Sequence, residues 1–346
     1  MTFDLNAINI NKEYYAHEVV KPKYPKEDKV LIIDGDILTY KVAAIGDTRC
    51  CKVTKNGKSK EFKNKTEFKR ICENKGWDYS TFEVEDILKP EPIEYCLGTL
   101  KAAVNNILER TGCTKYEIYI GGSGNHRLSL DLPTQYKAAR STQLRPTYLT
   151  DCKEYLIKWK GAIKIKGREA DDFVQQRMYE LYQDGIEAVA YSNDKDIRQE
   201  FRYNIRVFNP DDESTTTYLC NLGDLWLQPN GDVKGSGLKW LIGQTLFGDS
   251  TDNYKGNQLS GKRYGEKTYY NDVKDILTVK ELLEYAVSKW KSWYPDIVKY
   301  KTWDGRDVEK NWLEIANMYM SCAYMLISDN DKTTFESLLK EYSVEY

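Results

Sequence analysis

Short apolar runs alternate with longer amphipathic stretches over the first two thirds of the chain. The runs have the length and the apolar character of buried strands, and they cover residues 30–34, 117–122, 162–167, 186–194 and 205–209. Between them, apolar residues recur every three or four positions at 93–110 and 170–182, which predicts helices, and 151–160 fits a further helix. Strands that alternate with helices predict a parallel α/β sheet with right-handed crossovers.

The remaining segments divide the chain. Residues 1–27 show no periodicity and are interpreted as an N-terminal arm. A core is predicted over 28–222, with a polar insertion at 47–92 and a basic, aromatic-containing segment at 125–150. Helical periodicity dominates 223–346, with helices expected at 238–247, 279–294 and 312–326.

Composition narrows the function classes only slightly. The 346 residues include 51 Lys+Arg and 53 Asp+Glu, so bulk charge gives no sign of a nucleic-acid partner, although a local basic surface remains compatible with one. We expect a cytoplasmic protein, because the chain has no apolar run of 18 residues and no signal-peptide pattern at its start. The eight cysteines include no C-x-x-C pair, which favours reduced, mostly buried thiols.

Acidic residues stand at the carboxyl ends of the predicted strands. Asp34 ends the first strand, Asp194 ends the fourth, and Asp196 follows two residues later. The helix after the third strand opens with the acidic stretch 169–172. Taken singly, these residues also suit a helix N-terminus or a turn. Their convergence at one edge of a parallel sheet, where ligands bind in open α/β folds, favours a shared site.

Carboxylates held close together repel one another, and a compact divalent cation relieves the repulsion. Hard oxygen ligands favour Mg²⁺ or Mn²⁺ over zinc, and two such ions about 4 Å apart can hold both reacting oxygens of a phosphodiester. This chemistry needs no histidine base, and the chain has only His17 and His126. Asp36, close to Asp34, is either a turn residue or an additional ligand.

Five motifs in order make the pattern specific. They are IIDGD (32–36), QYKAAR (135–140), GREADDF (167–173), SNDKDI (192–197) and GDSTDN (248–253). From about residue 28 to about 270 the chain resembles the 5′ nuclease superfamily, which includes flap endonucleases, the 5′ nuclease domain of bacterial DNA polymerase I and small phage 5′→3′ exonucleases. The resemblance implies a PIN-like nuclease core followed by a helical DNA-binding region.

The resemblance also implies roles for individual residues. The resemblance implies that Asp34, Glu169, Asp171 and Asp172 are ligands of the first metal, or groups that link the two metals. The second metal falls to Asp194, Asp196, Asp249 and Asp252. The motif at 135–140 is similar to the family's basic arch, so Tyr136, Lys137 and Arg140 are expected to lie beside the scissile phosphate. Arg145, farther along the chain, is expected to contact nucleic acid. Without the resemblance, a solvated basic face is the simpler interpretation of Lys137 and Arg140.

One position departs from the family. The family places an Asp just after its second strand, and we expect that place to be occupied by Gly122 here. Two outcomes follow from this departure: Asp36 replaces the missing carboxylate, or metal binding is weaker.

The resemblance further implies a helix–two-turns–helix module, which grips duplex DNA through loop amides and a monovalent cation such as K⁺. Residues 254–268 lie at that place. The candidate contacts there are Gly256, Gly261, Lys262, Arg263, Gly265 and Lys267. An ordinary Gly/Lys surface loop is the alternative. The segment also nearly matches a P-loop, but Arg263 stands where Ser or Thr would bind Mg²⁺, so an ATPase is not expected.

Together these features predict a monomeric, two-metal 5′→3′ exonuclease or 5′ flap endonuclease. Its expected partners are DNA with 5′ ends, nicks or flaps, and RNA/DNA hybrids if it also removes primers; a phage-encoded chain would act in the host-cell cytoplasm. Two alternatives stay open. One is a junction-binding protein of the same fold with a weakened site, and the other is a PIN-type RNA endonuclease, which the motif at 248–253 and the helical C-terminal region disfavour.

Overall fold

A seven-stranded sheet forms the centre of the computed structural model, which describes residues 13–138, 140 and 143–346. Its spatial order is β1-β7-β6-β2-β8-β9-β10, and all neighbours are parallel except β9 and β10. The strands are β1 (Glu13–Tyr15), β2 (Lys29–Asp34), β6 (Lys115–Gly121), β7 (Ile163–Lys166), β8 (Glu187–Tyr191), β9 (Ile205–Asn209) and β10 (Ser214–Tyr218). The predicted, mostly parallel α/β sheet is confirmed.

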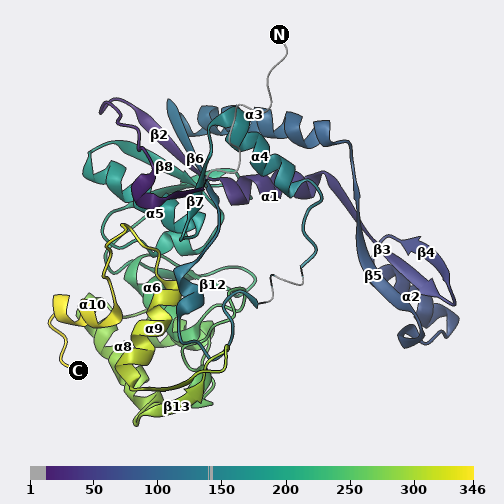
Figure 1. Ribbon diagram of the computed structural model, residues 1–346. Helices are drawn as coiled ribbons and strands as arrows, with labels where there is room; N and C mark the ends of the chain where they lie inside the picture. Colours follow the sequence, from purple (N-terminus) through teal and green to yellow (C-terminus); the bar gives the residue numbers. More distant parts are fainter. Residues whose placement is uncertain (1–12, 139, 141–142) are drawn as a thin grey trace.

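Helices cover both faces of this sheet (Figure 1). Residues along β2 alternate: Leu31 and Ile33 pack against one face's helices, and Val30 and Ile32 against those of the other. All four side chains are fully buried, as in a central parallel strand. The first face carries α1 (Gly35–Ile45), α3 (Ile93–Thr111) and α4 (Leu149–Lys160), and the second carries α5 (Ala170–Gln183).

A small unit, called the insert below (residues 47–90), projects from the end of α1 (Figure 1). Its antiparallel sheet has the order β4-β3-β5, and one helix packs against it. The elements are β3 (Asp47–Lys55), β4 (Lys58–Phe62), α2 (Lys65–Lys75) and β5 (Glu83–Pro90). The insert has a core of its own, formed by Cys51, Val53, Phe68 and Cys72.

Helices dominate the C-terminal region. Every residue of α6 (Gly237–Phe247) is buried, and the other helices of the region pack against it or against one another. They are α7 (Glu266–Val273), α8 (Val279–Trp293), α9 (Trp312–Ala323) and α10 (Phe335–Glu341). Two short hairpins accompany them, β11 (Leu225–Leu227) with β12 (Val233–Gly235) and β13 (Val298–Lys301) with β14 (Asp307–Lys310). No helix among the described residues is long and apolar enough to cross a membrane.

Residues 1–12 of the expected N-terminal arm lie outside the described residues. The rest of that segment includes β1, which adds an edge strand parallel to β7, with Glu13 opposite Lys164. Ala16 and Val19, just after β1, are buried in the same core as β2. The segment 13–19 is therefore part of the folded core.

Candidate metal centre and nucleic-acid interface

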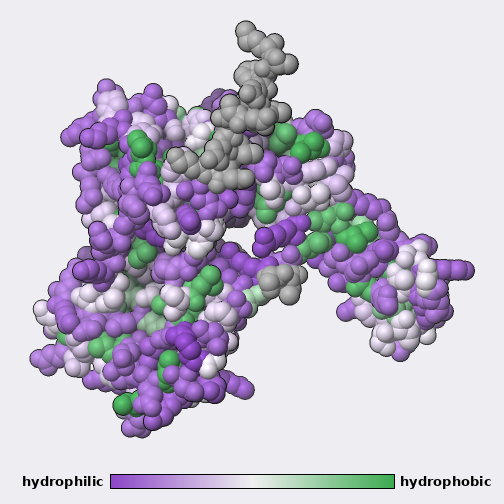
Figure 2. All heavy atoms as spheres, in the orientation of Figure 1, coloured by the Kyte–Doolittle hydropathy of each residue, from purple (hydrophilic) through white to green (hydrophobic). Residues whose placement is uncertain are grey.

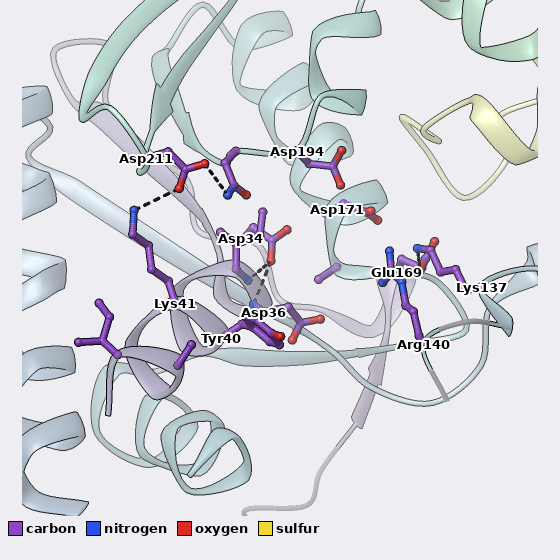
Figure 3. A pocket seen from close by; sticks show the side chains of 15 residues that line it. Asp34, Asp36, Tyr40, Lys41, Lys137, Arg140, Glu169, Asp171, Asp194 and Asp211 are labelled. Carbon is purple, nitrogen blue, oxygen red and sulfur yellow. Dashed lines mark hydrogen bonds and ion pairs between the residues drawn. The ribbon is translucent and has the colours of Figure 1, made fainter. Parts of the chain in front are cut away.

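A cavity of about 620 Å³ opens beside the carboxyl end of β2. Five of the predicted carboxylates line it, and Figure 3 shows them arranged around one space: Asp34, Asp36, Glu169, Asp171 and Asp194. Lys137 and Arg140 of the predicted arch line the same cavity. Segments far apart in the sequence therefore meet at the carboxyl ends of the parallel strands, where ligands bind in open α/β folds.

Asp34 is fixed by the start of α1. Its Oδ1 atom accepts hydrogen bonds from the backbone N–H groups of Asp36 (2.9 Å) and Ile37 (3.2 Å), so it caps the helix. Burial, followed by the charges of Asp36 and Asp194, raises the pKa of Asp34 to about 8. A nearby cation would stabilise the ionised form of a carboxyl group in this environment.

The start of α5 supplies the first acidic group. Carboxylate oxygens of Glu169, Asp171 and Asp172 lie within 4.8 Å of one another. Burial, together with the charges of Glu169 and Asp172, raises the pKa of Asp171 well above its usual range. Asp171 therefore bears a strong electrostatic penalty that a bound cation would relieve.

A second acidic group is formed by Asp196, Asp249 and Asp252, whose oxygens also lie within 4.8 Å of one another. Asp249 and Asp252 belong to the loop after α6, and both are buried. Burial and the charge of Asp194 raise the pKa of Asp196 well above its usual range, so the cavity carboxylates and this second group influence one another. Lys195 pairs with Asp249 at 2.8 Å and holds the loop against the sheet edge.

The predicted arch residues lie against both acidic groups. The Tyr136 hydroxyl donates to Asp252 Oδ2 at 2.6 Å, and Arg140 Nη2 contacts Asp252 Oδ1 at 3.0 Å. The Lys137 ammonium pairs with Glu169 and lies 3.6 Å from Asp252. Burial lowers the pKa of Lys137, but the charges of Glu169 and its acidic neighbours outweigh that effect and raise it. Lys137 is therefore a fixed positive charge at neutral pH.

Asp172 has a different environment from its neighbours. Its side chain is fully buried, and Arg127 forms a two-pronged ion pair with it, at 2.7 Å from Nη1 and 2.8 Å from Nη2. The backbone N–H of Leu326 also donates to Asp172 Oδ1 at 3.2 Å. Binding a metal through Asp172 would require these bonds to open. Asp171, beside it, lines the cavity.

Two glycines at the end of β6 explain why the acid expected after the second predicted strand is missing. A Cβ on Gly122 would lie 2.3 Å from the carbonyl oxygen of Ile165, so no side chain fits there. A Cβ on Gly121 would instead lie 2.7 Å from Asp36 Oδ2. The position that faces the acidic cavity is therefore Gly121 rather than Gly122, and the carboxylate of Asp36 occupies the space beside it, paired with Lys153 at 2.7 Å.

The segment 254–268 lies in the connection after α6 and extends into the first turn of α7, and it contains turns and a short 3-10 helix (Gln258–Ser260). Gly261 has a φ of +67° and open space where a side chain would stand, and Gly265 also faces open space. Lys262, Arg263 and Lys267 are exposed. A Cβ on Gly256 would lie 2.4 Å from the Thr245 carbonyl oxygen, so this glycine packs closely against α6, and its contact with nucleic acid stays a prediction.

Arg145 is exposed beside a second hollow, which it shares with Asp36, Tyr40 and Arg140. The contacts of Arg145 with nucleic acid stay a prediction.

Sequence reasoning missed several charged residues at the site. Arg127, Lys195 and the pair Lys41–Asp211 were not singled out, although Lys41 and Asp211 line the cavity and contact each other at 3.3 Å (Figure 3). Lys195 could have been found, since it stands between two predicted ligands. Arg127 carries no local signal, because its partner Asp172 lies 45 residues away.

The donor set fits hard divalent cations. The two acidic groups offer only carboxylate oxygens, without histidine or thiolate ligands. Burial raises the pKa values of four of these carboxylates, Asp34, Asp171, Asp196 and Asp252, as expected where a cation completes the site. All eight cysteines are free, and seven are buried, as the sequence predicted.

Comparisons with known proteins find a curated relative in sequence. The chain is 27% identical over 210 residues to a 5'-3' exonuclease of Buchnera aphidicola subsp. Schizaphis graminum, covering 57% of this chain and 70% of that protein. No family model matches the chain.

Solved structures of bacteriophage T5 proteins are also similar. A T5 flap endonuclease in complex with DNA and metal ions matches at 13% identity with a TM-score of 0.46, over 91% of this chain and 98% of the other. T5 5'-exonuclease with bound zinc ions matches at 14% identity with a TM-score of 0.47, over the same shares.

The sequence relationship extends over most of the Buchnera protein. The acidic motifs that carry the resemblance form the cavity and the second acidic group, and the arch cations contact carboxylates of both. In sequence, the chain is therefore similar to a 5'-3' exonuclease over most of that relative's length.

Proposed function

We propose that this chain is a divalent-metal-dependent 5′→3′ exonuclease and 5′ flap endonuclease that hydrolyses phosphodiester bonds of DNA, and of RNA primers paired to DNA, in replication, repair or phage genome metabolism. The observation that supports it best is the meeting of two carboxylate groups with the cations of one basic segment. Carboxylates alone would suit a structural ion site. Positive side chains at the same place suit a substrate that brings its own negative charge.

The metal assignment follows the geometry of the carboxylates. Asp34, Asp36, Glu169 and Asp171 would hold one Mg²⁺ or Mn²⁺, and Asp194, Asp196, Asp249 and Asp252 would hold or surround the other. Bound there, such ions supply an activated water and neutralise charge on the reacting phosphate. We assign Asp172 to positioning, as the buried partner of Arg127. A K⁺ at residues 254–268 belongs to the same proposal.

The chain's own cations would orient the phosphate. Lys137 keeps its proton, so it acts as a point charge rather than as a base. Burial raises the pKa of Tyr136 far above its usual range, so its hydroxyl stays a donor toward Asp252. Arg140 is half-exposed and offers a planar pair of N–H groups to a phosphate. Farther out, exposed Arg145, Lys262, Arg263 and Lys267 would neutralise backbone phosphates of the duplex.

The test is cleavage of fluorescently labelled single-stranded, nicked and 5′-flap duplexes, and of the same duplexes with an RNA 5′ segment, in Mg²⁺, Mn²⁺ or EDTA. Metal-dependent release from the 5′ end is expected, with mononucleotides indicating exonuclease action and longer fragments indicating flap cutting. Binding without cleavage in every metal would refute the nuclease proposal and leave the junction-binding alternative.

Asp171→Asn supplies the matched variant. It removes one cavity carboxylate and is expected to abolish cleavage while substrate binding in EDTA stays within a few-fold of the wild type. Asp184→Asn is the control, because Asp184 is an exposed carboxylate at the other end of the same helix, α5. Unchanged turnover in Asp171→Asn would refute the assignment of Asp171 as a metal ligand.

A further inference from the structure

The insert carries a groove, called the aromatic–lysine groove below, with a volume of about 410 Å³. Its walls combine aromatic rings with lysine side chains. Among its lining residues are the rings of Phe62, Trp77 and Phe82 and the ammonium groups of Lys55, Lys58, Lys60 and Lys75. The groove lies outside the acidic cavity and shares no lining residue with it. Figure 2 shows the insert standing out from the body of the molecule.

The four groove lysines are free of carboxylate partners within the described part of the chain, since none of them forms an ion pair there. Other cations of the insert do form such pairs: Arg49 with Asp86 at 2.8 Å and Lys52 with Glu85 at 3.3 Å. The groove is therefore lined by positive charge that no carboxylate of the described residues compensates.

Trp77 is the groove ring that core packing does not explain, whereas Phe62 and Phe82 pack against the insert's core with part of their surface accessible. The insert's own core is complete around Phe68, which is 1% exposed, whereas Trp77 keeps 45% of its surface exposed. Trp77 leans on Phe82 with ring centroids 5.8 Å apart. Lys75 lies 4.7 Å from the Trp77 ring centre, and Lys55 lies 4.2 Å from that of Phe82. Cations placed beside accessible rings suit a ligand that is both flat and negatively charged.

We propose that the aromatic–lysine groove binds single-stranded nucleic acid, with bases stacking on Trp77 and Phe82 and backbone phosphates beside the lysines. A duplex would offer its phosphates but keep its bases stacked, so it would leave the rings unused. An acidic peptide would use the lysines alone. This inference extends the proposed function without resting on it, because binding can be measured with all metal chelated.

Geometry places the groove within reach of a strand that occupies the acidic cavity. The 11-residue helix α1 runs from the cavity to the insert over about 16 Å, and the nine-residue strand β3 continues for about 30 Å at most. The separation along the chain is therefore at most about 45 Å, or about 13 steps of stacked nucleotides at 3.4 Å each. A strand longer than this can contact both places at once.

The experiment measures binding of a fluorescein-labelled oligothymidylate to the full chain in EDTA, by anisotropy. The double variant W77A/K75E is expected to weaken binding about 5-fold or more, because stacking on a ring and one charge are both lost. Its matched control is W159A/K158E: Trp159 is 55% exposed and carries Lys158 at 5.5 Å, but neither residue lines any of the grooves described here. The variant K58E/K60E should lower the salt slope of the binding constant by about 0.7 per lost contact.

Cross-linking locates the contact directly. Oligonucleotides that carry 5-bromodeoxyuridine should cross-link to peptides of the insert in the wild type and much less in W77A/K75E. Equal affinity and equal cross-linking in wild type and W77A/K75E would overturn the proposal, as would binding of polyglutamate that depends on the lysines but not on Trp77. Circular dichroism checks that the variants fold. Groove binding without any cleavage would refute the proposed function alone, and cleavage without groove binding would refute this inference alone.

Discussion

Replacing Arg127 with methionine tests how the acidic site is joined to the C-terminal region. The Arg127 guanidinium forms its two-pronged ion pair with Asp172 of α5 and also contacts Glu169 at 3.1 Å. It donates as well to the carbonyl oxygens of Cys322 (3.1 Å) and Tyr324 (2.7 Å), at the end of α9. Methionine keeps much of the side-chain volume but removes every one of these donors.

The size of the effect follows from burial. Arg127 is 3% exposed and Asp172 is fully buried, so the methionine variant leaves a desolvated carboxylate and two carbonyl groups without their donor. Breaking a buried pair in this way costs about 3–5 kcal/mol. We expect a loss of that size in the free energy of unfolding at pH 7.5, measured in EDTA by guanidinium titration with circular dichroism.

Two further variants separate the causes. In Arg127→Met/Asp172→Leu both charges are absent, so most of the lost stability should return. Arg306→Met is the control for a generic arginine, because Arg306 is half-exposed and its ion pairs with Asp131 and Asp304 lie at the surface. A loss below about 1 kcal/mol in Arg127→Met, or a double variant as unstable as the single one, would refute the buried-pair explanation.

Three other perturbations have defined outcomes. Lys137→Met should lower turnover about 100-fold in a single-turnover cleavage assay while changing the substrate Kd little. Glu13→Gln should lower the melting temperature at pH 7 but not near pH 2. Hydrogen bonds from Lys164 and Ser123 hold the pKa of Glu13 at about 2, below its ordinary 4.5. The stabilisation by ionised Glu13 is therefore present above pH 4.5 and disappears as the pH falls from 4.5 to 2. Gly122→Ala should lower the free energy of unfolding by about 1–3 kcal/mol. Gly121→Ala should mainly slow cleavage, because the added methyl group displaces Asp36. Equal losses of stability in the two variants would contradict the different roles of these glycines.

Periodicity predicted the central elements well because burial dominates them. The runs at 30–34 and 205–209 became β2 and β9 with bounds matching to within one residue, since fully buried parallel strands are apolar along their whole length. Helix α3 was predicted from its apolar spacing, and it ends where expected, at Gly112, whose φ is +64°.

Elements that depend on distant partners escaped prediction. The three residues of β1 show no alternation, and only their pairing with β7, about 150 residues later, makes them a strand. Helix α1 begins directly after the last residue of β2 without a loop, and no element was predicted for residues 35–45. The insert appeared only as a polar segment, because its core is small and most of its residues are exposed.

The candidate site was predictable in its carboxylates and less so in its cations. Acids such as Asp34 and Asp194 follow strands, so topology alone brings them to one edge. The cations come from loops and helix faces whose direction the sequence does not encode. The position of the missing acid shows the same limit. The register of β6 decides whether Gly121 or Gly122 faces Asp36, and the periodicity of the sequence does not fix that register to a single residue.

Helix α1 makes the distance between the cavity and the insert a fixed length. One end is held by Asp34, which caps it, and Leu38, Val42 and Ala43 are buried against the sheet, so the helix cannot slide or tilt freely. The insert starts two residues after its other end. With a strand held in the aromatic–lysine groove as proposed, this fixed length would present the same nucleotide to the carboxylates each time. Fragment lengths would then cluster around one value, and adding a turn to α1 would shift that value.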